Sequence, residues 1–142
     1  MDRKQKYGNL SAGHVDPDLS TDKHDEIMIW LDGKIEEYAK YCNGKVDRKV
    51  WEYPLFKGSR EYKSIVGYID ILASITNCGV IAFEVKSHIK SVGELIRQIR
   101  QYQSFCNGQT KFIVVSPDDR FVDVLKNQGI DFWKYEENGE TP

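Results

Sequence analysis

The sequence predicts a single α/β domain in which helices flank a mixed central β-sheet. Apolar residues recur at helical spacing in two long segments, and short runs rich in Ile, Val and Tyr lie between turn signals. These elements follow the order α-β-β-β-α-β-α-β. Three consecutive strands favour an antiparallel meander, and the later strand–helix–strand crossovers favour parallel pairing. The combination is a mixed sheet with helices packed against it.

The length and composition fit one compact domain. The chain has 142 residues, of which 40% are hydrophobic and 30% are charged. No apolar run approaches the ~20 residues of a membrane helix, so we expect a cytoplasmic protein without membrane association. We predict a flexible N-terminal arm at residues 1–22, a single domain at residues 23–136 and a frayed C-terminus at residues 137–142.

The charge and the cysteines narrow the class of protein. The net charge of −2 argues mildly against a basic nucleic-acid-binding domain, although a carboxylate site would also carry the charge of its metal ion. Cys42, Cys78 and Cys106 are odd in number and form no C-x-x-C pair. Neither a zinc site nor a disulfide framework is therefore indicated.

The first half of the chain predicts a helix followed by three strands. Thr21 or Asp22 is the expected N-cap, and Asn43 with Gly44 forms the expected left-handed stop. Apolar residues recur between these ends at helical spacing: Ile27, Trp30, Leu31, Ile35, Tyr38, Ala39 and Cys42. The three strands are expected, in chain order, at residues 49–56, 62–75 and 80–86.

The second half predicts two helices that alternate with two strands. Ser91 followed by Glu94 is the capping-box pattern that begins a helix over residues 91–106. The remaining elements are a buried strand, a third helix and a last strand, at residues 112–116, 118–127 and 130–135.

Three side chains of the central hairpin are expected to lie on one face. If the hairpin folds back at Asn77, Asp70 stands opposite Glu84, with Cβ atoms roughly 4.5–5.5 Å apart. Lys86 follows Glu84 by two residues and therefore points to the same face. The neighbours that point to the other face are expected in the core: Ile69, Ile71, Phe83 and Val85.

This arrangement suits the hydrolysis of a phosphodiester bond. Two opposed carboxylates are destabilising unless a cation compensates them, and Mg²⁺ is commonly held by one or two carboxylates. A neighbouring lysine stabilises charge on the attacked phosphate or orients the attacking water. The alternative is a pair of solvent-facing acids neutralised by Lys86 or another base.

The segments at residues 67–72 and 81–86 resemble the D…(E/D)-x-K motif of the PD-(D/E)XK, restriction-endonuclease-like nucleases. The resemblance implies their fold, with Asp70 and Glu84 as ligands of Mg²⁺ or Mn²⁺. It also implies that the carbonyl of Val85 assists the metal and that Lys86 is catalytic. Ile69 stands where the family has its proline, a departure that affects no ligand.

The following helix extends this resemblance to the RecB-type subgroup. Gln98 and Tyr102 match its Q-x-x-x-Y element, and residues four apart share one helix face. The resemblance implies that both residues contact DNA or orient the part of the site that contains Lys86. The alternative is that Tyr102 belongs to the core with its hydroxyl hydrogen-bonded.

The family also has an acidic residue on its first helix that completes the metal site. Glu26 is the predicted counterpart, with alternatives at Glu36, Glu37 and, on the first strand, Glu52. A histidine at a helix start without a second histidine, such as His24, is expected to be structural or exposed.

Four basic residues after the motif are candidates for contacts with DNA phosphates: His88, Lys90, Arg97 and Arg100. Surface charges at such positions are more often merely solvated, and that alternative stays open.

The sequence thus favours a Mg²⁺- or Mn²⁺-dependent deoxyribonuclease. A single small domain leaves little room for a sequence-reading module, so we expect structure-selective or end-directed cleavage, as an endonuclease or an exonuclease. Cutting both strands needs two sites, which is compatible with a homodimer, and a partner protein is an alternative means of targeting. The alternatives are a catalytically silent nucleic-acid-binding or assembly protein on the same fold, and an RNA-directed nuclease.

Overall fold

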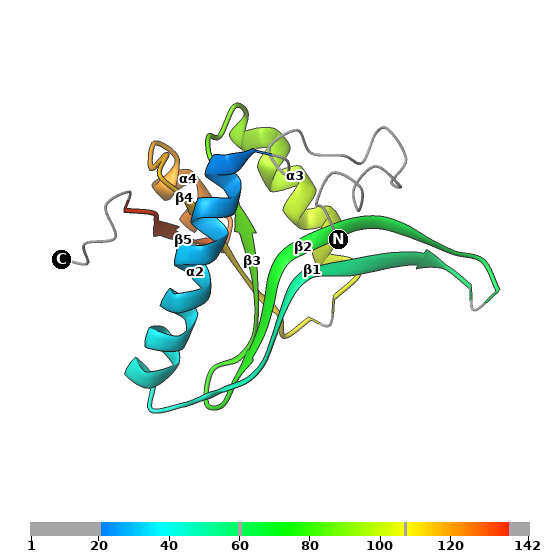
Figure 1. Ribbon diagram of the computed structural model, residues 1–142. Coiled ribbons are helices and arrows are strands. Elements are labelled where there is room, and N and C mark those ends of the chain that lie inside the picture. Colours follow the sequence, from blue (N-terminus) through cyan, green and yellow to red (C-terminus); the bar gives the residue numbers. More distant parts are fainter. Residues whose placement is uncertain (1–20, 60, 107, 137–142) are drawn as a thin grey trace.

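The computed structural model describes residues 21–59, 61–106 and 108–136, and Figure 1 shows how their elements are arranged. The elements follow the predicted order: α2 (Asp22–Tyr41), β1 (Val46–Gly58), β2 (Lys63–Ile75), β3 (Gly79–Val85), α3 (Val92–Gln103), β4 (Lys111–Ser116), α4 (Val122–Asn127) and β5 (Asp131–Lys134). The predicted arm at residues 1–22, apart from its last two residues, and the predicted tail at residues 137–142 lie outside the described residues. Within the described ranges, no helix is long and apolar enough to span a membrane.

Helix α2 begins and ends where the sequence predicts. Thr21 is the N-cap, and its side-chain oxygen accepts a hydrogen bond from the backbone N–H of His24 at 3.1 Å. Asn43 follows the helix with a φ of 56°, the left-handed conformation that stops a helix. The buried face of α2 is a stripe at helical spacing: His24, Ile27, Met28, Leu31, Ile35 and Ala39.

The strands form one mixed sheet in the order β1-β2-β3-β4-β5. The pairs β1–β2 and β2–β3 are antiparallel, whereas β3–β4 and β4–β5 are parallel. Helix α2 packs on a core that contains Phe83, and helices α3 and α4 pack on a second core that contains Phe112. The predicted fold class, a mixed central sheet flanked by helices, is therefore confirmed (Figure 1).

The hairpin between β2 and β3 has the predicted register. Its Cα partners are centred on Asn77, whose φ of 74° is a left-handed turn conformation. The ladder ends with Ile71 opposite Phe83. Asp70 and Glu84 are the next residues, and they lie just beyond the last paired rung.

The alternation of side chains along β2 changes at Asp70. Ile69 and Ile71 were expected on one face, but Ile69 packs on the α3 side of the sheet and Ile71 on the α2 side. In β1, Glu52 stands opposite Asp70 between two regular pairs and has a φ of 55°. A backbone irregularity of this kind turns a strand locally and re-aims its side chains. The expectation of a shared face for these two isoleucines was wrong for this reason.

Two helix boundaries differ from the prediction. Helix α3 ends at Gln103 rather than at residue 106, because the Ser104 hydroxyl donates a hydrogen bond back to the carbonyl of Gln101. Helix α4 begins at Val122 rather than at residue 118, since the side chain of Asp118 binds other groups instead of capping a helix. The first strand, predicted at residues 49–56, is longer at both ends because β2 offers it a partner over its whole length.

Candidate active site

Asp70 and Glu84 are buried carboxylates at the point where β2 and β3 separate. Only 1% of Asp70 and 3% of Glu84 is exposed. Oδ2 of Asp70 accepts a hydrogen bond from the backbone N–H of Val85 at 2.8 Å, which ties β2 to β3 beyond the last rung. Burying ionised carboxylates costs free energy unless a partner or a cation compensates them. The structure therefore places both predicted acids where such compensation is needed.

The first turn of α2 reaches this point through His24. Nε2 of His24 lies 3.4 Å from Oδ1 of Asp70, and both side chains are buried. The N-cap Thr21 fixes the start of the helix and hence the position of the imidazole. Of the two alternatives for His24, structural or exposed, its burial excludes the second. The signal for this burial was its place on the apolar stripe, four and seven residues before Met28 and Leu31.

The structure does not bring the predicted helix acid to Asp70. Glu26 lies off the buried stripe, with 59% of its side chain exposed and its carboxylate 3.7 Å from Nζ of Lys23. Of the alternatives on α2, Glu36 pairs with Lys49 and Glu37 pairs with Lys34. His24 of α2, by contrast, lies against the carboxylate of Asp70.

Lys86 begins the segment that leaves the sheet after β3. Its backbone N–H donates a hydrogen bond to the carbonyl of Val115 at 2.9 Å, which extends the parallel pairing with β4 by one residue. Its side chain is half-buried. Glu84, Val85 and Lys86 are thus held by β4 on one side while Asp70 holds the N–H of Val85 on the other.

Helix α3 contacts β2 close to the site. The side-chain amide of Gln98 donates a hydrogen bond to the Tyr102 hydroxyl at 3.0 Å, and Tyr102 is buried. A Cβ atom added to Gly67 would lie 2.7 Å from that hydroxyl oxygen. Tyr102 therefore packs directly on β2 at Gly67, which precedes Asp70 by three residues. Only glycine at that position leaves room for the tyrosine ring.

The four basic candidates do not act as one group. The guanidinium of Arg100 donates hydrogen bonds to Gln128 and Gln103, so this side chain ties α3 to the end of α4. His88 lies 3.4 Å from the carboxylate of Asp118. Lys90 and Arg97 are exposed, and neither side chain makes a hydrogen bond or an ion pair within the described ranges.

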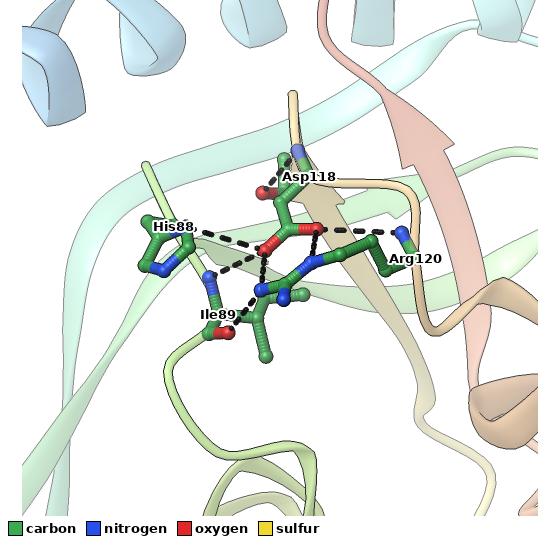
Figure 2. Close-up of polar contacts among 5 residues, drawn as sticks. His88, Ile89, Asp118 and Arg120 are labelled. Atoms are coloured by element: carbon green, nitrogen blue, oxygen red, sulfur yellow. Dashed lines mark hydrogen bonds and ion pairs between the residues drawn. The ribbon is translucent and has the colours of Figure 1, made fainter.

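The loop that carries Lys86 and His88 is held by a network around Asp118 (Figure 2). The Asp118 carboxylate accepts hydrogen bonds from the backbone N–H of Ile89 at 3.0 Å and from the Arg120 guanidinium at 2.7 and 2.8 Å. Arg120 also donates to the carbonyl of Ile89 at 2.9 Å. These contacts, led by the Arg120 side chain, hold the pKa of Asp118 well below its usual value. No sequence pattern predicts this network, because residues 88–89 and 118–120 are about thirty positions apart in the chain.

No family model matches this chain, and no curated protein matches it. Among solved structures, a repair endonuclease from Pyrococcus abyssi is 16% identical with a TM-score of 0.48, and an EndoMS–dsDNA2 complex is 18% identical with a TM-score of 0.44. Each alignment covers 76% of this chain but only 46% and 44% of the other chains, so the chain spans less than half of their length. At this level of likeness, neither structure bears on what this chain does.

The donors around Asp70 suit a divalent cation that prefers oxygen ligands. Oδ1 of Asp70 is buried and takes part in no hydrogen bond within the described residues. Glu84 and Val85 lie on β3, where the backbone N–H of Val85 binds the other oxygen of Asp70. In the described part of the chain, no three His, Cys, Asp or Glu side chains are already arranged as a metal site. Two carboxylates and a carbonyl nevertheless match the usual coordination of Mg²⁺, which keeps several waters and binds substrate phosphate.

Proposed function

We propose that this chain is a metal-dependent nuclease that hydrolyses phosphodiester bonds of DNA at Asp70, Glu84 and Lys86. The observation that carries the proposal is the buried carboxylate of Asp70. One of its oxygens is fixed by the N–H of Val85, and the other faces Nε2 of His24. A carboxylate held rigidly in this way is preorganised for a cation.

The residues have distinct roles in this proposal. Asp70, Glu84 and the carbonyl of Val85 would hold Mg²⁺ or Mn²⁺, with His24 as a further ligand or as the residue that orients Asp70. The bound ion would polarise the phosphate and lower the pKa of the attacking water. Lys86, fixed at the end of β3 by its backbone hydrogen bond to Val115, would place its ammonium group beside the reacting phosphate.

The substrate class is part of the proposal. The described residues present one candidate site, for which we propose structure-selective or end-directed cleavage. Breaking both strands of a duplex then needs two chains or two binding events, and a homodimer or a targeting partner would supply this. RNA is the alternative substrate, since the chemistry of the site is the same for both nucleic acids.

Cleavage assays test the proposal directly. The purified protein is incubated with supercoiled, linear, single-stranded and branched DNA, and with RNA, in Mg²⁺ or Mn²⁺. Asp70→Ala and Lys86→Met should each reduce the cleavage rate by roughly 10²-fold or more. Glu26→Ala is the matched control, because this exposed acid lies on α2 outside the site. Cleavage that survives either site substitution would contradict the assignment.

One observation favours a catalytically silent binding protein as the second candidate. Within the described residues, no group of three His, Cys, Asp or Glu side chains is arranged to hold a metal ion. This alternative predicts binding of DNA by the unaltered protein, no cleavage of any substrate in either metal, and no effect of Asp70→Ala on DNA affinity.

A further inference from the structure

The β1–β2 hairpin extends far beyond the rest of the sheet. β3 pairs with β2 only from Ile71 to Ile75, whereas β1 pairs with β2 out to Gly58 opposite Lys63. The outer part, residues 56–58 with residues 63–65, is a two-stranded arm that projects beyond the buried core residues Leu55 and Ile69 (Figure 1). An isolated ribbon of two strands is only marginally stable in water.

The tip of the arm exposes aromatic rings and positive charge. Phe56 is 47% exposed and Tyr62 is 80% exposed. Lys57 and Lys63 are also exposed, and Nζ of Lys63 lies 5.9 Å from the centre of the Phe56 ring. Residues 56–64 of the sequence include three basic residues and one acidic residue, although the whole chain has a net charge of −2. The tip therefore has the sign that attracts a polyanion.

The arm is continuous with the candidate site. β2 is one continuous strand from Lys63 at the tip to Asp70 at the site, with a register shift at Val66, and seven residues of strand span at most about 23 Å. The same length corresponds to roughly seven base-pair steps of duplex DNA. Tyr102 of α3 packs on Gly67 between these two points and supports the root of the arm.

We propose that the tip of this arm is a docking surface for double-stranded DNA whose scissile phosphate lies at Asp70. Lys57 and Lys63 contact phosphates about seven base pairs from the site, and Tyr62 packs against the sugar edges there. A two-stranded ribbon also has the width that the major groove admits. This inference rests on the proposed nuclease function, and it makes a duplex, rather than a single strand, the substrate.

Binding without cleavage tests the docking surface. Fluorescence anisotropy with the full chain in EDTA measures its affinity for a duplex of about 20 base pairs and for one of about five, too short to span from site to tip. Lys57→Ala/Lys63→Ala should weaken binding of the long duplex by roughly tenfold and lower the salt slope by about two. The short duplex should bind the wild-type protein and the Lys57→Ala/Lys63→Ala variant with equal affinity.

The matched control is Lys40→Ala/Lys126→Ala, which removes two exposed lysines at the ends of α2 and α4. Equal losses in this control and in the tip variant would overturn the proposal. So would a wild-type dimer that Tyr62→Ala converts to a monomer with unchanged DNA affinity, since the tip would then contact a second copy. Length-dependent binding without cleavage in any metal would support the docking surface and refute the proposed nuclease function.

Discussion

Nε2 of His24 and Oδ1 of Asp70 lie 3.4 Å apart and are both buried, although the two residues are far apart in the sequence and belong to a helix and a strand. This contact holds the first turn of α2 against the hairpin that carries the predicted acids. A nitrogen donor beside carboxylates also changes which ion the site prefers, because imidazole suits transition metals and carboxylates suit Mg²⁺.

His24→Ala should therefore change the metal preference of the protein. We expect Mn²⁺ to raise the melting temperature of the wild-type protein more than Mg²⁺ does, and the variant to lose this difference. Cleavage with Mn²⁺ should fall by roughly 10–100-fold. Thermal unfolding with each metal checks the prediction, and a variant that keeps the wild-type preference would show that His24 is structural.

The sequence predicted the hairpin well because its register follows from local rules. Asn77 adopts the left-handed turn, and the apolar residues on both sides of it permit one pairing of the strands. The change of faces at Asp70 was not predictable in the same way. It accompanies a positive φ at Glu52, and glutamate gives no signal of a left-handed conformation.

The structure does not bring Glu26, the acid of α2 that was expected at the site, beside Asp70. Glu26 matched the expected residue type, but the apolar stripe of α2 places it on the exposed face. His24 lies on the stripe, and helical phase alone would have selected it. The Asp118 network depends on the tertiary contact between two loops, which no local pattern reports.

Gly67→Ala should destabilise the protein through its contact with α3. The new methyl group would lie 2.7 Å from the Tyr102 hydroxyl and 2.8 Å from Cε1, so we expect a loss of roughly 1–3 kcal/mol in the free energy of unfolding. Urea denaturation measures it. In the Tyr102→Ala background the same substitution should cost much less, because the collision is gone.

Gly33→Ala is the control for this substitution. An added Cβ at Gly33 meets nothing within 4 Å, and alanine is favoured over glycine in a helix by about 0.5–1 kcal/mol. A Gly67→Ala variant as stable as the wild type would contradict the close approach of Tyr102 to β2.

The Asp118 network should make stability depend on acid pH. Hydrogen bonds from Arg120, and from the backbone of Ile89, hold the pKa of Asp118 well below its usual value in the folded state. Its contribution is therefore fully present above the unfolded pKa of about 3.9 and is lost as the pH falls through the lower folded value. Asp118→Asn should cost roughly 1.5–3 kcal/mol at neutral pH, and the difference from wild type should shrink below about pH 4.

Urea unfolding across this pH range measures both effects. Asp123→Asn is the control, because Asp123 is an exposed acid of α4 without an ion pair in the described residues. A difference between the wild type and Asp118→Asn that stays constant down to pH 2 would show that the charge of Asp118 does not stabilise the fold.

The central claim is that Asp70 and Glu84 hold a divalent cation. Isothermal titration calorimetry of the folded protein with Mn²⁺ tests it most directly, with Asp70→Ala beside the exposed-acid control Glu26→Ala. We predict saturable binding by the wild type and the control, and none by Asp70→Ala at the same concentrations. Equal binding by all three proteins, or no binding by the wild type, would contradict the claim.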